Sequence, residues 1–167
     1  MYIAFGLEVL LVWQKFHRWL YQGGHPTLLT RVINRGWAAV HSLGIAPNYL
    51  VTLEVVGRRS GRLISFPLAM VPLDGERYLV SMLGREAAWV KNVRAANGQA
   101  TLRHGLTEQV QLEELAVEKR ARVLKAYLRL APGARPHIPV DKNAPLEEFQ
   151  AIAEQFPVFC LATSRTV

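Results

Sequence analysis

The sequence contains a single cysteine among its 167 residues and no apolar run long enough to cross a bilayer. One cysteine excludes an internal disulfide framework and a cysteine-rich zinc site, and it favours a reducing compartment. A spanning helix needs about 20 apolar residues, and the apolar start at residues 1–13 is shorter. Acidic residues are also few, 13 against 20 Lys and Arg, which gives a formal charge of +7. This excess favours a polyanionic ligand, an anionic membrane surface or nucleic acid as a partner.

Motifs of several functional classes are missing as well. Residues 57–61, GRRSG, place their Ser one position too late for the G-x-S-x-G nucleophile elbow, and they lack the G-K-[ST] end of a P-loop. The five His residues show no paired metal spacing, and Cys160 lies in an apolar stretch that predicts a buried core position. The sequence therefore predicts no metal site and no catalytic side chain. The absence of a recognition-helix motif and of a basic tail argues against nucleic acid.

The N-terminal segment has the spacing of an amphipathic helix over residues 3–21. Trp13 and Phe16 lie near its basic end, an arrangement that suits a membrane interface. Packing of the same helix on its own domain or on a second subunit stays open. We expect residues 1–24 to form this helix, packed on the domain or on a membrane, and residues 25–167 to form one domain.

The rest of the chain alternates between strand-like and helix-like periods. Short turns such as Asp74–Gly75 join several strands and are too short for parallel crossovers, so the pattern predicts an α+β fold with a small, mainly antiparallel barrel. The expected strands are 49–56, 63–71, 77–83, 99–104, 107–115 and 156–163, and the expected helices are 27–43, 86–96, 117–131 and 146–155.

The turn GRRSGR at residues 57–62 concentrates three arginines and two glycines in six residues. Glycine allows a close approach to the backbone, serine adds a hydroxyl, and arginine offers a planar fork that fits phosphate or carboxylate. The turn is a candidate anion site, and a solvated hairpin turn is the alternative.

Three motifs in order carry a family resemblance: LEVVGRRSGR at 53–62 followed by Pro67-Leu68, DGERYLVS at 74–81, and WVKNVRA at 89–95. Together they resemble the deazaflavin-dependent nitroreductase family, whose members are split β-barrels that bind the deazaflavin coenzyme F420. The chain departs from the family pattern at Ile64, where an Arg is usual, and at Ala69, where the best known members have Tyr.

The resemblance implies a set of site residues. The basic turn would contact the phosphate and acidic tail of the coenzyme, and the helix with Trp89 and the strand with Pro67 would lie by its ring. The substrate contacts would come from Tyr127 and from the N-terminal helix through Trp13 and Phe16. The residues implied for the cofactor are Arg58, Arg59, Ser60, Gly61, Arg62, Pro67, Leu68, Trp89 and Asn92.

Two classes of function stay open. The first is an oxidoreductase that transfers a hydride from reduced F420, or from FMN in the same cleft, to a small apolar acceptor such as a quinone, an unsaturated lipid or a nitro compound. The second is a non-catalytic split barrel that binds a hydrophobic ligand or lipid at a membrane. We expect a cytoplasmic protein, with contact to the inner membrane face and a homodimer left open.

Overall fold

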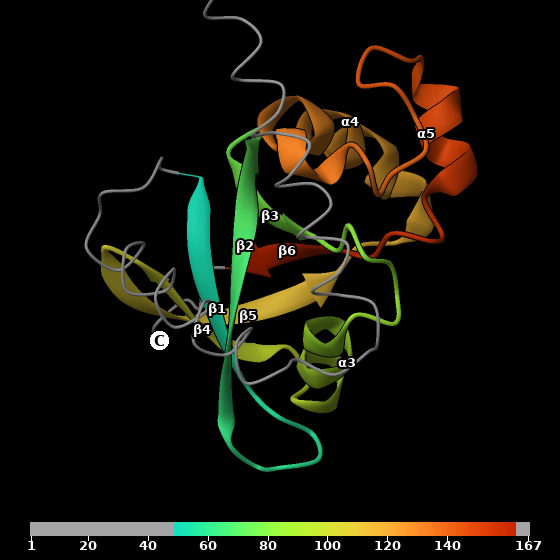
Figure 1. Ribbon diagram of the computed structural model, residues 1–167. Coiled ribbons are helices and arrows are strands. Elements are labelled where there is room, and N and C mark those ends of the chain that lie inside the picture. The colour runs from blue at the N-terminus through green and yellow to red at the C-terminus, as the bar shows by residue number, and fades with distance from the viewer. Residues whose placement is uncertain (1–48, 163–167) are drawn as a thin grey trace, which may run out of the picture. The chain divides into compact units, whose positions relative to one another are not determined.

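The strands form a closed antiparallel barrel (Figure 1). They are β1 (Leu50–Val56), β2 (Leu63–Leu73), β3 (Glu76–Val80), β4 (Gln99–His104), β5 (Leu106–Glu114) and β6 (Val158–Ala162). The computed structural model describes residues 49–162. The strand order around the barrel is β1-β2-β3-β6-β5-β4, and β1 pairs with β4 to close it. The α+β fold with a six-stranded antiparallel barrel, predicted from the sequence, is confirmed.

Two Asx-Gly pairs terminate elements where the sequence predicts turns. Asp74 and Gly75, with φ of 53° and 82°, join β2 to β3 in the left-handed conformation that a tight hairpin needs. Asn97 and Gly98, with φ of 51° and 81°, end the helix α3 (Ala88–Ala95). The Gly98 N–H then donates to the Val93 carbonyl, as in a helix C-cap.

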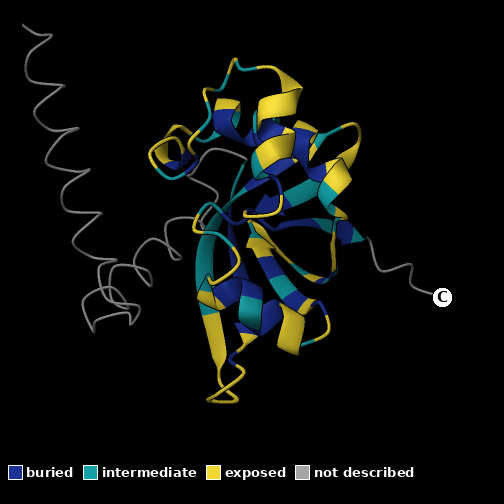
Figure 2. Cartoon of the chain, turned by 90° about the vertical axis from the view of Figure 1, so that its right-hand side faces the viewer, coloured by how far each residue is buried: buried dark blue, intermediate teal, exposed yellow. Residues whose placement is uncertain are grey.

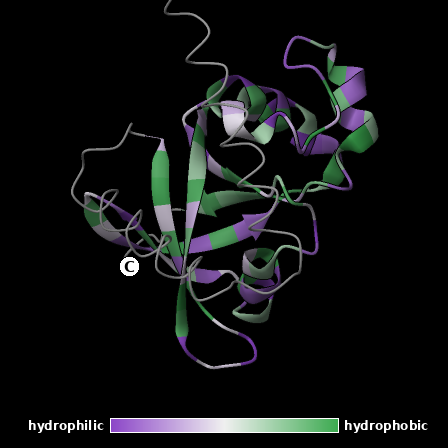
Figure 3. Ribbon diagram, in the orientation of Figure 1, coloured by the Kyte–Doolittle hydropathy of each residue, from purple (hydrophilic) through white to green (hydrophobic). Residues whose placement is uncertain are grey.

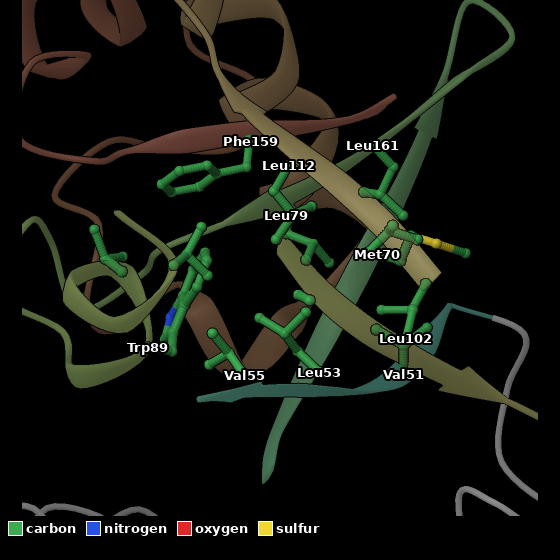
Figure 4. Packing of buried hydrophobic residues seen from close by; sticks show 14 residues of the cluster. Val51, Leu53, Val55, Met70, Leu79, Trp89, Leu102, Leu112, Phe159 and Leu161 are labelled. Atoms are coloured by element: carbon green, nitrogen blue, oxygen red, sulfur yellow. The ribbon is translucent and has the colours of Figure 1, made fainter. Parts of the chain in front are cut away.

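The barrel interior is filled by apolar side chains. Along β1, Val51, Leu53 and Val55 are at most 1% exposed and point inward (Figure 4). The helix α3 closes one end of the barrel with Trp89, whose ring centroid lies 5.3 Å from that of Phe159. A ligand of coenzyme size must therefore bind outside the barrel.

A second core covers the outer face of β2, β3 and β6. The helices α4 (Arg120–Leu130) and α5 (Leu146–Ile152) pack there, with short 3-10 turns, η1 (Val117–Lys119) and η2 (Pro132–Ala134), on either side of α4. Figure 2 shows the buried stripes of these helices turned toward the sheet, while the hairpin between β1 and β2 ends in exposed residues. Two faces of the molecule thus differ: one is covered by helices, and the other carries the protruding hairpin.

The structure corrects some sequence predictions. The third strand ends at Val80 rather than at residue 83, because the Ser81 hydroxyl donates to the Gly84 carbonyl and turns the chain. Cys160 is not a core residue: it is half-buried on the outer face of β6, between the inward-pointing Phe159 and Leu161. An unbroken apolar run does not reveal which face a strand buries, which explains the error. The predicted helices at 3–21 and 27–43, and the division of the chain at residue 24, lie outside the described residues.

Candidate functional site

The basic turn is an ordered loop between β1 and β2. The Gly57 N–H donates to the Arg62 carbonyl across 2.8 Å, and the Gly57 carbonyl accepts from Ser60 and Gly61. A Cβ on Gly57 would lie 2.6 Å from Ile64 Cδ1 and 2.7 Å from Ser60 Oγ, so no other residue fits without a shift. Gly61 has φ of 63°, which favours glycine.

Most backbone N–H groups of this turn are already used. The Arg62 N–H donates to Ser60 Oγ, the Arg58 N–H donates to Asn92 Oδ1, and those of Gly57, Ser60 and Gly61 bond within the turn. Within residues 49–162, only Arg59 in this turn has an N–H without a partner. Anion binding here must therefore come mainly from side chains, whereas sequence reasoning assigned part of it to the backbone.

Asn92 joins the turn to α3. This residue is 3% exposed, and its Oδ1 accepts from Arg58 Nη1 at 2.9 Å and from the Arg58 N–H at 3.3 Å. Both partners are donors, so the amide oxygen must face them. Two motifs 34 residues apart in the sequence therefore meet in one contact.

Arg59 and Arg62 are exposed, and neither guanidinium has a hydrogen bond or ion pair within the described residues. No acidic residue lies between Glu54 and Asp74 in the sequence to neutralise them. Figure 3 shows the turn as a hydrophilic segment between apolar strand ends, of which Val56 and Leu63 are 49% and 59% exposed. The turn thus presents uncompensated positive charge.

Other predicted residues flank the same region on β2 and α3. Pro67 is half-buried and pairs in register with Thr52 of β1, while Leu68 and Trp89 belong to the barrel core. Trp89 is only 6% exposed, so its ring face is used by the core rather than presented to solvent. Sequence reasoning missed Thr52, which is 2% exposed and whose Oγ1 has no hydrogen-bond partner among residues 49–162. A polar residue in an alternating strand gives no sign that it will be buried.

Tyr127 lies apart from this region. It is 4% exposed in the second core between α4 and the barrel, and burial raises the pKa of its hydroxyl to about 12. The predicted substrate contacts Trp13 and Phe16 lie outside the described residues. Among the residues expected around the cofactor, the structure joins Arg58 to Asn92, whereas Leu68 and Trp89 are used by the barrel core. Tyr127 belongs to the second core and is not part of this group.

A surface hollow of about 600 Å³ lies on the helical side of the molecule. Both apolar and charged residues line it, and two of them, Arg122 and Asp74, form an ion pair at 2.9 Å. None of the residues expected around the cofactor lines it. The lining residues are Leu73, Asp74, Tyr78, Leu115, Glu118, Lys119, Ala121, Arg122, Val123, Leu146, Glu147 and Gln150.

Residues 49–162 contain neither a candidate metal site nor a candidate membrane-spanning helix. No group of three or more His, Cys, Asp or Glu side chains there is placed to hold a metal ion. No helix in that range combines the length and the apolar character needed to span a membrane. The Cys160 thiol lies 3.8 Å from Glu76 Oε2, and burial together with that carboxylate raises its pKa, which disfavours a reactive thiolate.

The model of the F420H2-dependent quinone reductase family matches residues 30–145. The chain belongs to this family. The match spans the basic turn, α3 and α4, so the same segments that carried the sequence resemblance also carry the family assignment. An F420H2-dependent family member is a deazaflavin-dependent oxidoreductase, and its cofactor is the deazaflavin coenzyme F420.

Solved structures share the split-barrel fold of this family member. A protein of unknown function from Agrobacterium tumefaciens matches with a TM-score of 0.53 and 10% identity over 77% of this chain and 54% of its own. This chain thus spans about half of the length of that protein. A conserved hypothetical protein from Mycobacterium tuberculosis matches with a TM-score of 0.50 and 12% identity, over 77% of this chain and 80% of its own. At these identities the likeness shows the fold alone.

A structure described as an F420-H2 dependent reductase has 24% identity and a TM-score of 0.43, over 68% of this chain and 94% of its own. A search of the curated proteins finds no match.

The residues of the turn fit the acidic tail of F420. Arg59 and Arg62 supply two uncompensated guanidiniums, Ser60 adds a hydroxyl, and no carboxylate of the turn competes for them. Guanidinium forks bind phosphate and carboxylate oxygens through paired hydrogen bonds. The donor set is therefore the one that a phosphate followed by carboxylates requires.

Proposed function

We propose that this family member binds F420 with its acidic tail at the β1–β2 turn and transfers a hydride to a quinone or a similarly apolar acceptor. The observation that carries the proposal is the pair of unpaired guanidiniums, Arg59 and Arg62, on an ordered turn that Asn92 holds against α3. The family match supports a quinone as the proposed acceptor class.

The reduced coenzyme, when bound, supplies a hydride and a proton, and the quinone takes up both to become a quinol, so atoms and charges balance. The protein then needs no acid–base pair of its own. Its residues have to hold the tail, fix the position of the ring and exclude water from it. We assign Arg59 and Arg62 to the first task and Pro67, on the strand that leads from the turn, to the second.

Thr52 supports a ligand site beside Pro67. Its neighbours Val51 and Leu53 point into the barrel, so the Thr52 side chain points to the outer face, where Pro67 is its partner in register on β2. A buried hydroxyl without a hydrogen bond is uncommon, because it loses its bonds to water without a replacement. A polar group of a bound ligand would satisfy it, provided that binding first exposes this hydroxyl, because Thr52 is only 2% exposed in this structure.

The direct test is a fluorescence titration of F420 with the full chain and with Arg59→Ala and Arg62→Ala, at low and at high salt. Each substitution should weaken binding by about 10- to 100-fold at low salt, the size expected for a charge-assisted hydrogen bond. Arg129→Ala is the matched control, because it removes an exposed arginine from α4. It should leave the dissociation constant within about twofold.

The second measurement is anaerobic oxidation of the reduced coenzyme on addition of a short-chain quinone, followed by the return of the oxidised coenzyme's absorbance. Binding of FMN but not of F420 would make the protein a flavin-dependent reductase. Binding of neither, with retention of the protein on lipid vesicles, would favour the non-catalytic lipid-binding alternative, including contact of the N-terminal residues with a membrane.

A further inference from the structure

We infer that Asn92 is a positioning residue, which orients the Arg58 guanidinium toward the coenzyme tail without neutralising it. This inference rests on the proposed function, because it assigns Arg58 as a third cation of the same anion site. The family resemblance pointed to Asn92 as a direct cofactor contact, whereas the geometry gives its side-chain oxygen a different partner.

Asn92 Oδ1 engages Arg58 at two points. The 2.9 Å bond from Nη1 fixes the guanidinium, and the 3.3 Å bond from the main-chain N–H fixes the residue that bears it. One bond from Nη1 leaves the other N–H groups of the fork free for a second acceptor. Asn92 itself is 3% exposed on the buried face of α3, between Trp89 and Val93, so its own position is set by the barrel core.

Whether an arginine is paired with a carboxylate or with a neutral amide decides how much of its positive charge is left for a ligand. Six arginines of the described residues have a carboxylate partner, and that partner cancels their charge. Arg58 is held by a neutral amide instead. An amide oxygen orients the fork and leaves its full positive charge for a ligand. This combination of a fixed direction and a free charge is what a preorganised anion site needs.

The test is a double-mutant cycle on F420 affinity with Arg58→Ala, Asn92→Ala and the double variant. Each single change should raise the dissociation constant by about tenfold, the size of one charge-assisted bond. The double variant should be no weaker than the weaker-binding single variant, since removal of Asn92 has little left to disturb once Arg58 is gone.

Salt dependence provides a readout that a purely structural role would not change. If Asn92 acts by orienting Arg58, then Asn92→Ala should flatten the dependence of affinity on salt in the same direction as Arg58→Ala but by less, because the Arg58 charge remains and only its orientation is lost. The variant Asn92→Asp keeps the acceptor and the size of the side chain but neutralises Arg58. It should therefore retain the thermal midpoint of the wild type and still show the flattened salt dependence.

The possible outcomes separate this inference from the proposed function. If Arg59→Ala and Arg62→Ala leave F420 binding intact, the proposed function fails. If they weaken it while Arg58→Ala and Asn92→Ala do not, the function stands and the role of Asn92 is refuted. Additive losses in the double variant would also overturn the inference, because they would show that Asn92 contacts the coenzyme directly. Should Asn92→Ala fail to fold, the cycle is run with Asn92→Leu, which is uncharged, is similar in size and lacks the acceptor oxygen, and for which the same non-additivity is expected.

Discussion

The arginines of the β1–β2 turn and Arg120 of α4 occupy opposite environments. Arg59 and Arg62 are exposed and have no carboxylate within the described residues, whereas Arg120 is 6% exposed and makes three hydrogen bonds. Its Nε donates to the Leu115 carbonyl, Nη1 to the Ala153 carbonyl and Nη2 to Glu114 Oε1. Arginine therefore has a structural role at Arg120 and provides unpaired charge at Arg59 and Arg62.

The contrast shows why the net charge alone misleads. Arginines with carboxylate partners contribute little field at the surface, so a basic composition need not mean a basic surface. Arg58, Arg59 and Arg62, which have no carboxylate partner within the described residues, lie together in one turn, where their charges can act on one ligand. Four predictions, some with a matched control substitution, test this division between the two regions.

Arg120→Ala should have the largest effect, a loss of about 3–5 kcal/mol in the free energy of unfolding, because it leaves two carbonyls without their buried donor and leaves Glu114 with Arg94 as its remaining cation. Urea denaturation measures the loss. The matched control is Arg122→Ala, two residues further along α4, whose pair with Asp74 is exposed and should contribute at most about 1 kcal/mol. A comparable loss for both variants would contradict the division into buried and exposed pairs.

Tyr127 tests whether the second core is structural or part of the substrate site. Tyr127→Ala should lower the free energy of unfolding by about 3 kcal/mol, since it removes a buried aromatic ring. Tyr127→Phe keeps the ring and should leave both stability and quinone reduction close to wild type. A large loss of activity in a stable Tyr127→Phe protein would instead return this residue to the substrate site, as first predicted.

Acid should weaken the contact between α3, β5 and α4. The Arg94 guanidinium, with further help from Arg120, holds the pKa of Glu114 below its ordinary value. A depressed pKa means that the carboxylate adds stability above the unfolded-state pKa and loses this contribution as pH falls through the folded-state value. Glu114→Gln should therefore cost about 1–3 kcal/mol at pH 7 and progressively less below about pH 4.

Urea denaturation of wild type and Glu114→Gln at a series of pH values measures this difference. A gap that stays constant between neutral and strongly acidic pH would mean that the ionised carboxylate is not the source of the effect.

The smallest effect on stability should come from the turn itself. Arg59→Ala should change the free energy of unfolding by less than about 0.5 kcal/mol, because an exposed side chain without partners contributes little. The same variant should lose F420 affinity, so the two measurements move independently. A marked loss of stability would show that Arg59 has a structural partner and would remove it from the proposed anion site.

Local patterns were enough to predict most of the fold. The Asx-Gly pairs at residues 74–75 and 97–98 marked the ends of elements, because only a few residues tolerate positive φ. Alternating apolar residues located the strands to within a few positions. The burial of Cys160 was predicted wrongly, because its strand is apolar at every position and offers no alternation to interpret.

The sequence predicted the arginine-rich turn of the candidate site, but it did not predict the contacts between the turn and other segments. The density of arginine at residues 57–62 was visible in the sequence, and the structure shows that their backbone N–H groups are mostly engaged. That Asn92 would hold Arg58, or that Thr52 would be buried without a partner, depends on contacts between segments far apart in the chain. No local rule predicts such contacts.

The sequence by itself determined the family, the order of strands and helices, and the place where unpaired charge accumulates, because these depend on composition and short-range pattern. Only the tertiary structure decided that β6 lies between β3 and β5, that Tyr127 is a core residue, and that an amide rather than a carboxylate orients Arg58. The physical reason is that a side chain's chemistry is fixed by its own residue, whereas its burial and its partners are fixed by what the rest of the fold places beside it.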